Sequence, residues 1–361
     1  MARNKQITES KANAPFYLIS ANDRMERASK QSVPNMLFSE CIYEKDLTVL
    51  FAPAGVGKTV LAMHIADSIS QGKSIEGFKN EAPAQPVVYF DLELSDVQFQ
   101  GRYAKKIVGF DNKKKFIDNN KWSKNLGIAL FDLYDTPKGV DEVDFLMEGI
   151  IEMANKAKSK IIFIDNISWL ASQGMEKSKD ASVLMKKLTN LKRDNGFTLI
   201  VLAHTPKRLK WQPIELMDLA GSALIGNFID ACFTINYSTF EGDKNSRYIK
   251  QLKCRFSEMI FHSESVKTVK LARVKENFTG IEVCVPDELD NYNSERNHLS
   301  KVDNPATVIV TPEVSDNNKK KTVEVLQENP DASSRDIAKL VGVSHTTVQK
   351  YTNELFNNNG Q

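Results

Sequence analysis

The chain has 361 residues, with 48 lysines and arginines against 46 aspartates and glutamates, which gives a formal net charge of +2 at pH 7. This length accommodates one large core of roughly 250 residues and a small appended domain. A charge so close to neutral excludes a protein that binds nucleic acid through its overall charge, so any basic surface must be local.

Targeting and redox signals are weak. The opening residues "MARNKQITESKANAPFYLIS" contain no apolar core of signal-peptide length, and no stretch reaches the roughly 20 apolar residues of a membrane span. The four cysteines are widely spaced with no C-x-x-C pair, which argues against zinc ligation by cysteine. We therefore expect a protein of the reducing cytoplasm with no membrane partner.

A phosphate-binding loop is the first motif along the chain. Residues 47–67, "LTVLFAPAGVGKTVLAMHIAD", join an apolar run that fits a buried strand to a helical pattern expected to end at Gly72. Between them lies the pattern G-x-x-x-x-G-K-[ST], with Ala52 in place of the first glycine. The predicted loop comprises Ala54, Gly55, Val56, Gly57, Lys58, Thr59 and Val60.

The chemistry of this loop suits the phosphates of a nucleotide. Gly55 and Gly57 let backbone N–H groups approach phosphate oxygens, and the N-terminus of the following helix adds its positive dipole. Lys58 reaches the β- and γ-phosphates, and Thr59 can be a ligand of Mg²⁺. The alternative is a glycine turn followed by a surface lysine, but the flanking strand and helix are the context that the motif requires.

Beyond the loop, strand-like and helix-like segments alternate, which predicts an α/β fold with a mostly parallel sheet. Further strands are predicted over residues 87–91, 128–131, 161–165, 198–204, 232–237 and 248–253, with helices clearest over 143–157 and 181–192. From residue 266, "VKTVKLARVKENFTGIEVCV" predicts two strands around a turn at Thr279 and Gly280. The expected parts are an extension over 1–34, a nucleotide-binding domain over 35–286, a polar linker over 287–317 and a small helical domain over 318–361.

Acidic residues follow two of the predicted strands. "KIIFIDNISWL" places Asp165 at the end of an apolar strand, where a carboxylate can hold Mg²⁺ beside a phosphate-binding loop; a plain turn residue is the alternative. "VVYFDLELSD" places Asp91 and Glu93 on the same side of an extended segment. Glu93 is the better candidate for polarising the attacking water, because that carboxylate must not be engaged by the metal. An ordinary polar edge after a strand is the alternative.

Three further side chains are candidates for contact with the nucleotide. His204 ends the strand in "TLIVLAHTPKR", at the edge where open α/β sheets bind ligands, so we favour a sensor of the γ-phosphate over a structural histidine. "QLKCRFSE" places Lys253 and Arg255 on one side of an extended segment. Such a pair is usually a solvated strand face, but in a ring of subunits it could reach the nucleotide of a neighbour.

The chain resembles the RecA-like ATPases, and within them the plasmid RepA-type hexameric replicative helicases, in the order of the motifs "APAGVGKT", "YFDLELSD", "FIDNISWL", "VLAHTPKR", "AGSALIGNFID" and "KCRFSE". The resemblance covers roughly residues 35–286. It implies a RecA-like P-loop core that hydrolyses ATP with Mg²⁺ in a homo-hexamer or similar ring. The matching residues are Lys58 and Thr59 for phosphate and metal, Asp165 for metal, Glu93 as base, His204 as sensor, and Lys253 and Arg255 for the adjacent subunit.

The resemblance also implies where a DNA strand would be bound. RecA-like rings contact it through the loops after the third and fourth core strands, here "ASQGMEKSKD" and "PKRLKWQPIE". In the second loop, Lys207, Arg208 and Lys210 can neutralise phosphates and Trp211 offers a ring for base stacking. A solvated loop is the alternative, because basic loops are common.

The C-terminal sequence "KKKTVEVLQENPDASSRDIAKLVGVSHTTVQKYTNELF" resembles a helix-turn-helix. Ser333 and Ser334 are expected to cap one helix and Ser344 the next, with a turn at Gly342 between them. The predicted core comprises Ile337, Ala338, Val341, Val343 and Val348. The candidate contacts with duplex DNA are His345, Thr346, Thr347, Gln349 and Lys350. Units of this kind also bind proteins, which is the alternative.

These observations favour a ring-forming, ATP-hydrolysing DNA helicase or translocase with a DNA-binding tail. The resemblance alone suggests work in the replication or mobilisation of a plasmid, phage or other mobile element. A second hypothesis is an ATP-switched DNA-binding regulator or recombination accessory protein that separates no strands.

Overall fold

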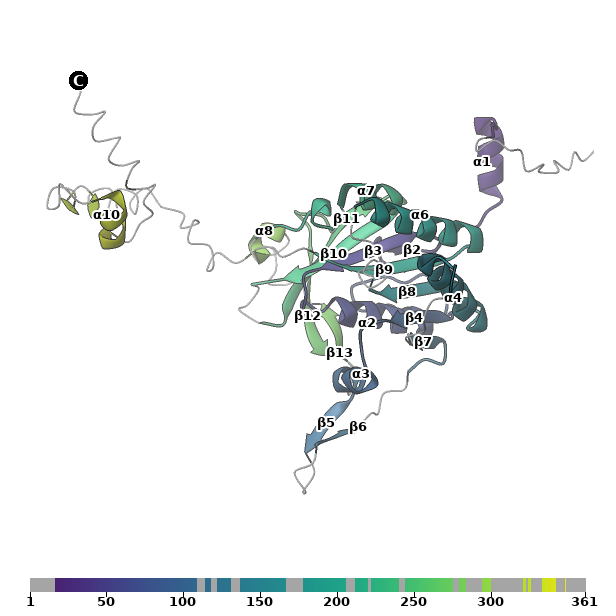
Figure 1. Cartoon of the computed structure of the whole chain (residues 1–361), viewed down its shortest axis with the longest axis horizontal. Helices are drawn as coiled ribbons and strands as arrows, with labels where there is room; N and C mark the ends of the chain where they lie inside the picture. Colours follow the sequence, from purple (N-terminus) through teal and green to yellow (C-terminus); the bar gives the residue numbers. More distant parts are fainter. Residues whose placement is uncertain are drawn as a thin grey trace, which may run out of the picture. The chain divides into compact units, whose positions relative to one another are not determined.

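The computed structural model describes residues 17–108, 114–117, 122–130, 137–166, 178–205, 212–219, 222–239, 244–274, 279–283, 294–299, 321–322, 324–325, 333–341 and 348 of the chain. The chain divides into two compact units, Met1–His298 and Leu299–Gln361. Figure 1 labels most of the helices and strands of both units.

The first unit is built on a nine-stranded sheet (Figure 1). Its strands are Leu47–Ala52 (β3), Val87–Asp91 (β4), Leu126–Leu130 (β7), Ile161–Asp165 (β8), Thr198–His204 (β9), Ala231–Tyr237 (β10), Ser246–Cys254 (β11), Lys267–Arg273 (β12) and Thr279–Val283 (β13). The order across the sheet is β13-β12-β11-β10-β3-β9-β8-β4-β7. Neighbours from β10 to β7 are parallel, and β11, β12 and β13 are added in antiparallel pairing. The predicted α/β fold with a mostly parallel sheet is therefore confirmed.

Two small two-stranded sheets accompany the large one. They pair Met36–Phe38 (β1) with Ile42–Tyr43 (β2), and Lys105–Val108 (β5) with Lys114–Ile117 (β6). The helices are Ala21–Ser29 (α1), Lys58–Gln71 (α2), Asp96–Tyr103 (α3), Glu142–Lys156 (α4), Ser178–Asn195 (α6), Ser222–Phe228 (α7), Glu295–His298 (α8) and Ser334–Val341 (α10). In the part of the chain that the structure describes, no helix is long and apolar enough to span a membrane.

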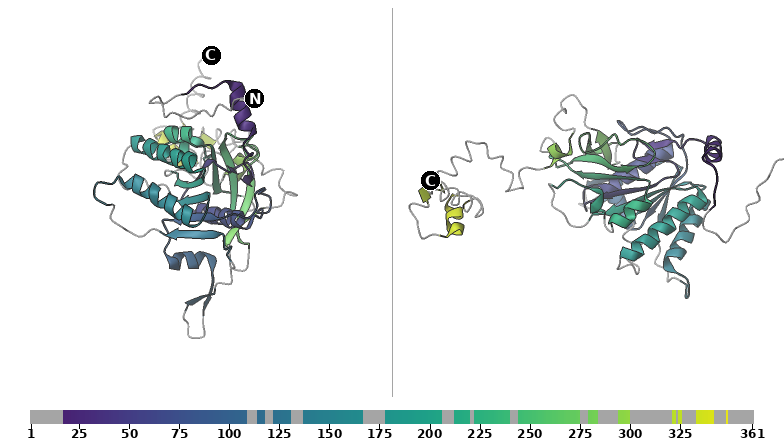
Figure 2. Two further views of the ribbon diagram at one scale, coloured as in Figure 1. Left: turned by 90° about the vertical axis from the view of Figure 1, so that its right-hand side faces the viewer. Right: turned by 90° about the horizontal axis from the view of Figure 1, so that it is seen from above.

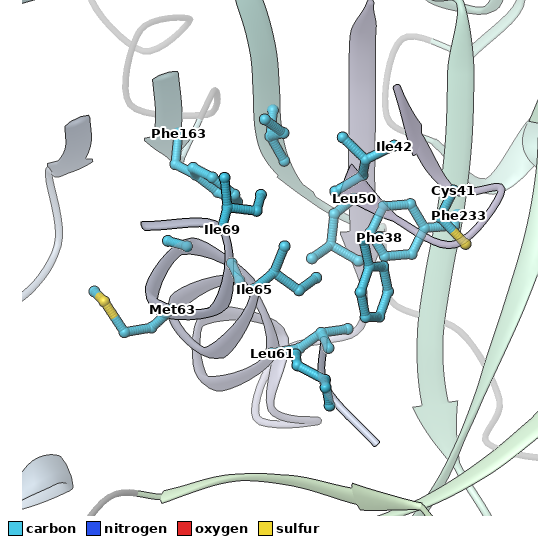
Figure 3. Close-up of a cluster of buried hydrophobic side chains, with 14 of the residues drawn as sticks. Phe38, Cys41, Ile42, Leu50, Leu61, Met63, Ile65, Ile69, Phe163 and Phe233 are labelled. Atoms are coloured by element: carbon cyan, nitrogen blue, oxygen red, sulfur yellow. The ribbon is translucent and has the colours of Figure 1, made fainter. Parts of the chain in front are cut away.

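Helices cover both faces of the large sheet, as its parallel strands require. On one face, Leu61, Ile65 and Ile69 of α2 pack over β3 and β8, and Figure 3 shows them beside Leu50 and Phe163. On the other face, α4 and α6 lie side by side in a second buried cluster (Figure 2). The strands between the two clusters are buried on both sides, which explains why they read as continuous apolar runs.

The predicted turn at Thr279 and Gly280 is wrong. Both residues belong to β13, where Thr279 pairs with Arg273 and Gly280 with Ala272. Glycine suits this position because a Cβ at Gly280 would lie 2.7 Å from the Nδ1 atom of His64, a buried residue of α2. Close packing of a helix against the strand therefore explains a glycine that resembles a turn residue in the sequence.

Helix α8 lies within the predicted linker over 287–317, yet it packs into the first unit. The Lys250 ammonium donates to Oε2 of Glu295 over 2.6 Å, and both side chains are buried. Oε1 of Glu295 accepts from the Tyr248 hydroxyl (2.8 Å) and from the backbone N–H of Ile214 (3.0 Å). Glu295 of α8 can therefore be buried although it is charged, because its partners lie inside the unit. The other predicted domain limits stay predictions.

The described part of the second unit contains α10 and a small apolar cluster. Ser333 caps α10, since its Oγ accepts from the backbone N–H of Asp336 (3.3 Å). The buried residues are Ile337, Ala338, Val341 and Val348, with Val325 packed against them. Four of the five predicted core residues therefore come together, and the fifth, Val343, lies outside the described residues.

Candidate functional site

The candidate site lies at the carboxyl edge of the parallel strands. Ala52 of β3 is in register with His204 of β9, and Asp91 of β4 is in register with Asp165 of β8. All four residues end their strands, so the segments that follow meet at one edge of the sheet. Open α/β sheets bind their ligands at this edge.

The predicted phosphate loop connects β3 directly to α2. Gly55 and Gly57 have φ angles of +75° and +108°, values that favour glycine over residues with a Cβ. A Cβ at Gly57 would also lie 2.8 Å from Cδ1 of Leu271. No side chain caps the N-terminus of α2, which begins at Lys58. The loop and the first turn of α2 thus have the backbone form that binds anions through N–H groups.

Lys58 and Asp165 form a buried ion pair beside the loop. Nζ of Lys58 lies 3.5 Å from Oδ1 of Asp165, and the two side chains are 5% and 0% exposed. The Tyr89 hydroxyl donates to Oδ2 of Asp165 over 2.8 Å. Among the described residues, neither Nζ of Lys58 nor Oδ1 of Asp165 has a hydrogen-bond partner. Buried charged atoms with unused hydrogen-bonding capacity fit a site that takes phosphate and a divalent cation.

Glu93, Asn166 and His204 form a polar cluster next to this pair. The side-chain amide of Asn166 donates to Oε1 of Glu93, and its nitrogen lies 3.2 Å from Nε2 of His204. Nε2 of His204 is 3.4 Å from Oε1 of Glu93. The hydrogen bond with His204 lowers the pKa of Glu93 and, with the charge of Lys58, outweighs the opposing effect of burial. Glu93 is therefore a carboxylate at neutral pH, the form that a general base requires.

Asp91 has a different place from Glu93, although the sequence puts both on one side of an extended segment. Its Oδ1 accepts the backbone N–H groups of Glu93 (3.2 Å) and Leu94 (3.0 Å). Asp91 is buried, and burial raises its pKa. Its carboxylate closes the turn that carries Glu93, so Asp91 positions that residue.

Sequence reasoning did not single out two residues that contribute to the site. Asn166 follows Asp165 directly, and only its position after a strand end could have drawn attention to it. Arg247 of β11 donates from Nε to the carbonyl of Val56 in the phosphate loop over 2.7 Å, and its guanidinium lies 4.6 Å from the centre of the Tyr237 ring. Nothing in the local sequence marks Arg247, because its partner is 191 positions away.

Lys253 and Arg255 lie at the opposite edge of the sheet from the phosphate loop. Cys254 pairs with Ala231, which in turn pairs with Thr48 near the start of β3. Lys253 donates to the carbonyl of Gly226 (2.6 Å), and Arg255 forms an ion pair with Asp230 (3.2 Å). About 13 Å of strand separates Thr48 from the loop end of β3. The pair is therefore not part of the phosphate site of its own chain.

The predicted DNA contacts fall outside the described residues. This holds for Lys207, Arg208, Lys210 and Trp211 of the core loop and for His345, Thr346, Thr347, Gln349 and Lys350 of the tail. The described residues nearest to the loop are Thr205 and Gln212, and α10 is the described helix of the tail.

Comparison with known proteins gives two family matches. A protein-family profile described as an AAA domain matches residues 15–209, and one described as a winged helix-turn-helix that binds DNA matches residues 315–357. A search of curated proteins found no significant match. Among solved structures, a KaiC-like protein from the hyperthermophilic archaeon Pyrococcus horikoshii OT3 is similar with a TM-score of 0.45 and 16% identity, over 68% of this chain and 93% of that chain.

The edge that holds Arg255 contains a carboxyl with an unusual proton affinity. Burial, followed by the charge of Asp230, raises the pKa of Asp46 from 3.8 to about 7. A proton that binds more tightly to the folded state stabilises the fold at low pH, and this contribution is lost as pH rises from about 4 to 7. Ionisation of Asp46 therefore destabilises the folded chain near neutral pH.

We predict that Asp46→Asn removes this pH dependence. Between pH 5 and pH 8 the wild type should lose about 2 to 3 kcal/mol of unfolding free energy relative to the variant. Urea denaturation at both pH values measures the difference. Asp194→Asn, an exposed substitution of the same kind, is the control and should behave as the wild type. Parallel pH profiles for wild type and Asp46→Asn would contradict the assignment.

Proposed function

Since the chain belongs to the AAA domain family, we propose that it is a ring-forming DNA helicase or translocase driven by ATP hydrolysis. The P-loop ATPase core and the winged helix-turn-helix give the coarse description, an ATPase that binds DNA. The contact of the Glu93 carboxylate with Asn166 and His204, beside the buried pair of Lys58 and Asp165, is the observation that supports hydrolysis. The helicase and ring parts of the proposal rest on the motif resemblance.

Hydrolysis is assigned to the residues of the carboxyl edge. Backbone N–H groups of residues 54–60 bind the phosphates, and Lys58 neutralises charge on the β- and γ-phosphates. Thr59 and Asp165 would hold Mg²⁺, which supplies charge neutralisation at the transferred phosphoryl group. Glu93 accepts a proton from the attacking water as the water oxygen adds to the γ-phosphorus and the bond from that phosphorus to the β-phosphate oxygen breaks, which yields ADP and phosphate. Asn166 donates a hydrogen bond to the Glu93 carboxylate and positions it. His204 contacts the same carboxylate and is assigned as the sensor of the γ-phosphate.

Lys253 and Arg255 suit a role on the nucleotide of a neighbouring subunit. They lie at the amino ends of the parallel strands, away from the phosphate loop of their own chain, which supports contact with the site of another copy. An arginine that reaches across an interface can accelerate phosphoryl transfer by about 10³ to 10⁵. This placement supports a head-to-tail ring, of which a hexamer is the form that the sequence resemblance suggests.

DNA is assigned to two parts of the chain. The loop with Lys207, Arg208, Lys210 and Trp211 binds a single strand through phosphates and stacking. The winged helix-turn-helix adds duplex recognition through its second helix. Replication or mobilisation of a plasmid, phage or other mobile element is the setting that the motif resemblance suggests.

The alternative function is an ATP-switched regulator or recombination accessory protein that binds duplex DNA. The winged helix-turn-helix favours it, because site recognition on a duplex needs no strand separation. The two functions differ in which part of the chain stimulates hydrolysis when DNA is added.

We predict that Glu93→Gln binds ATP with near-normal affinity but hydrolyses it about 10² to 10⁴ times more slowly, because the amide cannot accept a proton. Lys58→Ala should lose ATP binding. Calorimetric titration with ATP and a phosphate-release assay measure the two properties. Glu282→Gln, the same change on an exposed strand residue, is the control. Normal turnover in Glu93→Gln would remove Glu93 as the base.

A mixing experiment tests action between subunits. Arg255→Ala and Lys58→Ala should each be inactive, whereas their mixture should regain activity at interfaces that combine an intact loop with an intact arginine. Lys58→Ala mixed with Glu93→Gln is the matched control, since both changes damage the same site and no interface becomes complete. If subunit exchange is demonstrated and activity does not return, Arg255 does not act on a neighbour.

The core loop and the tail should be separable. Deletion of the residues after Asp316 should leave basal hydrolysis and its stimulation by single strands nearly intact, and remove the preference for a particular duplex. Trp211→Ala with Lys210→Ala should suppress the stimulation, with loss of stacking worth about 1 to 3 kcal/mol, and spare duplex binding. Light scattering must show unchanged assembly in both variants. The opposite pattern of losses would favour the regulator.

A further inference from the structure

A lysine-rich hairpin projects from the ATPase unit. Strands β5 and β6 pair only with each other among the described strands, and Figures 1 and 2 show them extending beyond α3, away from the large sheet. The two strands contain four lysines, Lys105, Lys106, Lys114 and Lys115, and no acidic residue. Their net charge of +4 exceeds the +2 of the whole chain, so positive charge is concentrated in these two strands although the overall composition is nearly neutral.

The strand register distributes lysines over both faces of the hairpin. Lys106 pairs with Phe116 and Val108 with Lys114, and these four positions share one face. Lys105 pairs with Ile117 and Ile107 with Lys115 on the other face. Neither face is purely apolar, so the two strands lack the apolar face with which an amphipathic element inserts into a membrane. An aromatic residue among cations is instead typical of surfaces that bind nucleic acid.

The base of the hairpin is firmly attached to the unit. Tyr103 ends α3 just before β5, and Trp122 follows β6; their ring centres lie 5.4 Å apart at an interplanar angle of 85°. The side chains of Ser123 and Asn125 donate to the carbonyl of Ser70 on α2 (3.1 and 3.0 Å). An isolated two-stranded hairpin is only marginally stable in water. These ring and hydrogen-bond contacts therefore stabilise β5 and β6 on the unit.

The carbonyl of Arg102 gives a second attachment, at the C-terminal end of α3. It accepts a hydrogen bond from Oγ1 of Thr279 over 3.0 Å, which ties α3 to β13. The N-terminus of α3 is capped by Ser95, two residues after Glu93. The hairpin is thus attached to the unit where its strands begin and end. The short helix α3 joins it to the turn that carries Glu93, the proposed general base.

We propose that the paired strands β5 and β6 are a further nucleic-acid contact, distinct from the core loop and from the tail. Its lysines bind phosphate oxygens without reading sequence, and Phe116 gives a stacking surface for an unpaired base. The site does not depend on hydrolysis, so it can be tested by binding alone even if the proposed motor function fails. Phosphates of a single strand and of a duplex share this chemistry, and separate probes distinguish them.

The test replaces Lys105, Lys106, Lys114 and Lys115 with glutamine in the full chain. Binding of a fluorescent 30-nucleotide single strand and of a 30-base-pair duplex is followed by anisotropy, without nucleotide, across a series of salt concentrations. For the single strand, affinity should fall at least about tenfold near 100 mM salt, and the slope of log K against log salt should become shallower by about 2 to 3. A larger effect on the duplex would identify duplex phosphates as the preferred source.

Three controls keep the result interpretable. Four exposed lysines elsewhere, Lys73, Lys156, Lys158 and Lys186, are replaced by glutamine to match the change in charge, and this variant should keep the wild-type slope. Arginine at the four hairpin positions should restore binding. The pairs Lys105→Gln with Lys106→Gln, and Lys114→Gln with Lys115→Gln, should each give about half of the slope change, so the test survives if the fourfold variant folds poorly.

Two results would overturn the proposal. One is a hairpin variant whose affinity and salt slope match those of the charge-matched control. The other is wild-type binding to vesicles of phosphatidylserine and phosphatidylcholine that the hairpin glutamines abolish, with nucleic-acid binding unchanged. The second result would make the arm a membrane contact.

Discussion

The buried pair of Lys58 and Asp165 is the constraint on which the site depends. Each charge is almost fully removed from water, and a lone charge in that position would cost several kcal/mol. The two apolar strands bring the charges together: Lys58 opens the helix after β3, and Asp165 closes β8. Tyr89 satisfies one oxygen of Asp165 and leaves the other toward the lysine. Glu93 and His204 lie beside this ion pair, whose two charges are held in place by the strands of the sheet.

The parts of the site that follow from local sequence were predictable. Continuous apolar runs fix β3, β8 and β9, because strands buried on both faces tolerate few polar residues. The residue at the end of such a run must lie at the carboxyl edge, so Asp165 and His204 could be placed before any coordinates. Glycines with positive φ at 55 and 57 are likewise required by the loop conformation.

Contacts between distant segments were not predictable in this way. Asn166 and Arg247 act through partners that lie 73 and 191 positions away. Asn166 stands in the motif "FIDNISWL", but the motif does not reveal its contact with Glu93, and Arg247 stands in none of the quoted motifs. Helix α8 resembled a linker because its sequence is polar. It packs into the unit because Lys250 and Tyr248, more than 40 positions earlier, are hydrogen-bond partners of Glu295. Gly280 resembled a turn residue because the sequence does not reveal the approach of His64. In each case the missing information is the tertiary partner.

The phosphate loop and Arg255 lie at opposite ends of the strands of the sheet, and under the proposed action of Arg255 on a neighbouring subunit this has a consequence for stoichiometry. A subunit that binds nucleotide at one end of its strands and offers Arg255 to a neighbour from the other end assembles head to tail. Such an assembly of subunits either closes into a ring or stays open. In a closed assembly every nucleotide is completed by a neighbour. In an open assembly the nucleotide of one terminal subunit has no arginine from a neighbour. Turnover per subunit therefore rises with the number of subunits and reaches its full value only when the ring closes. Specific activity therefore becomes a measure of ring closure, independent of any image of the particle.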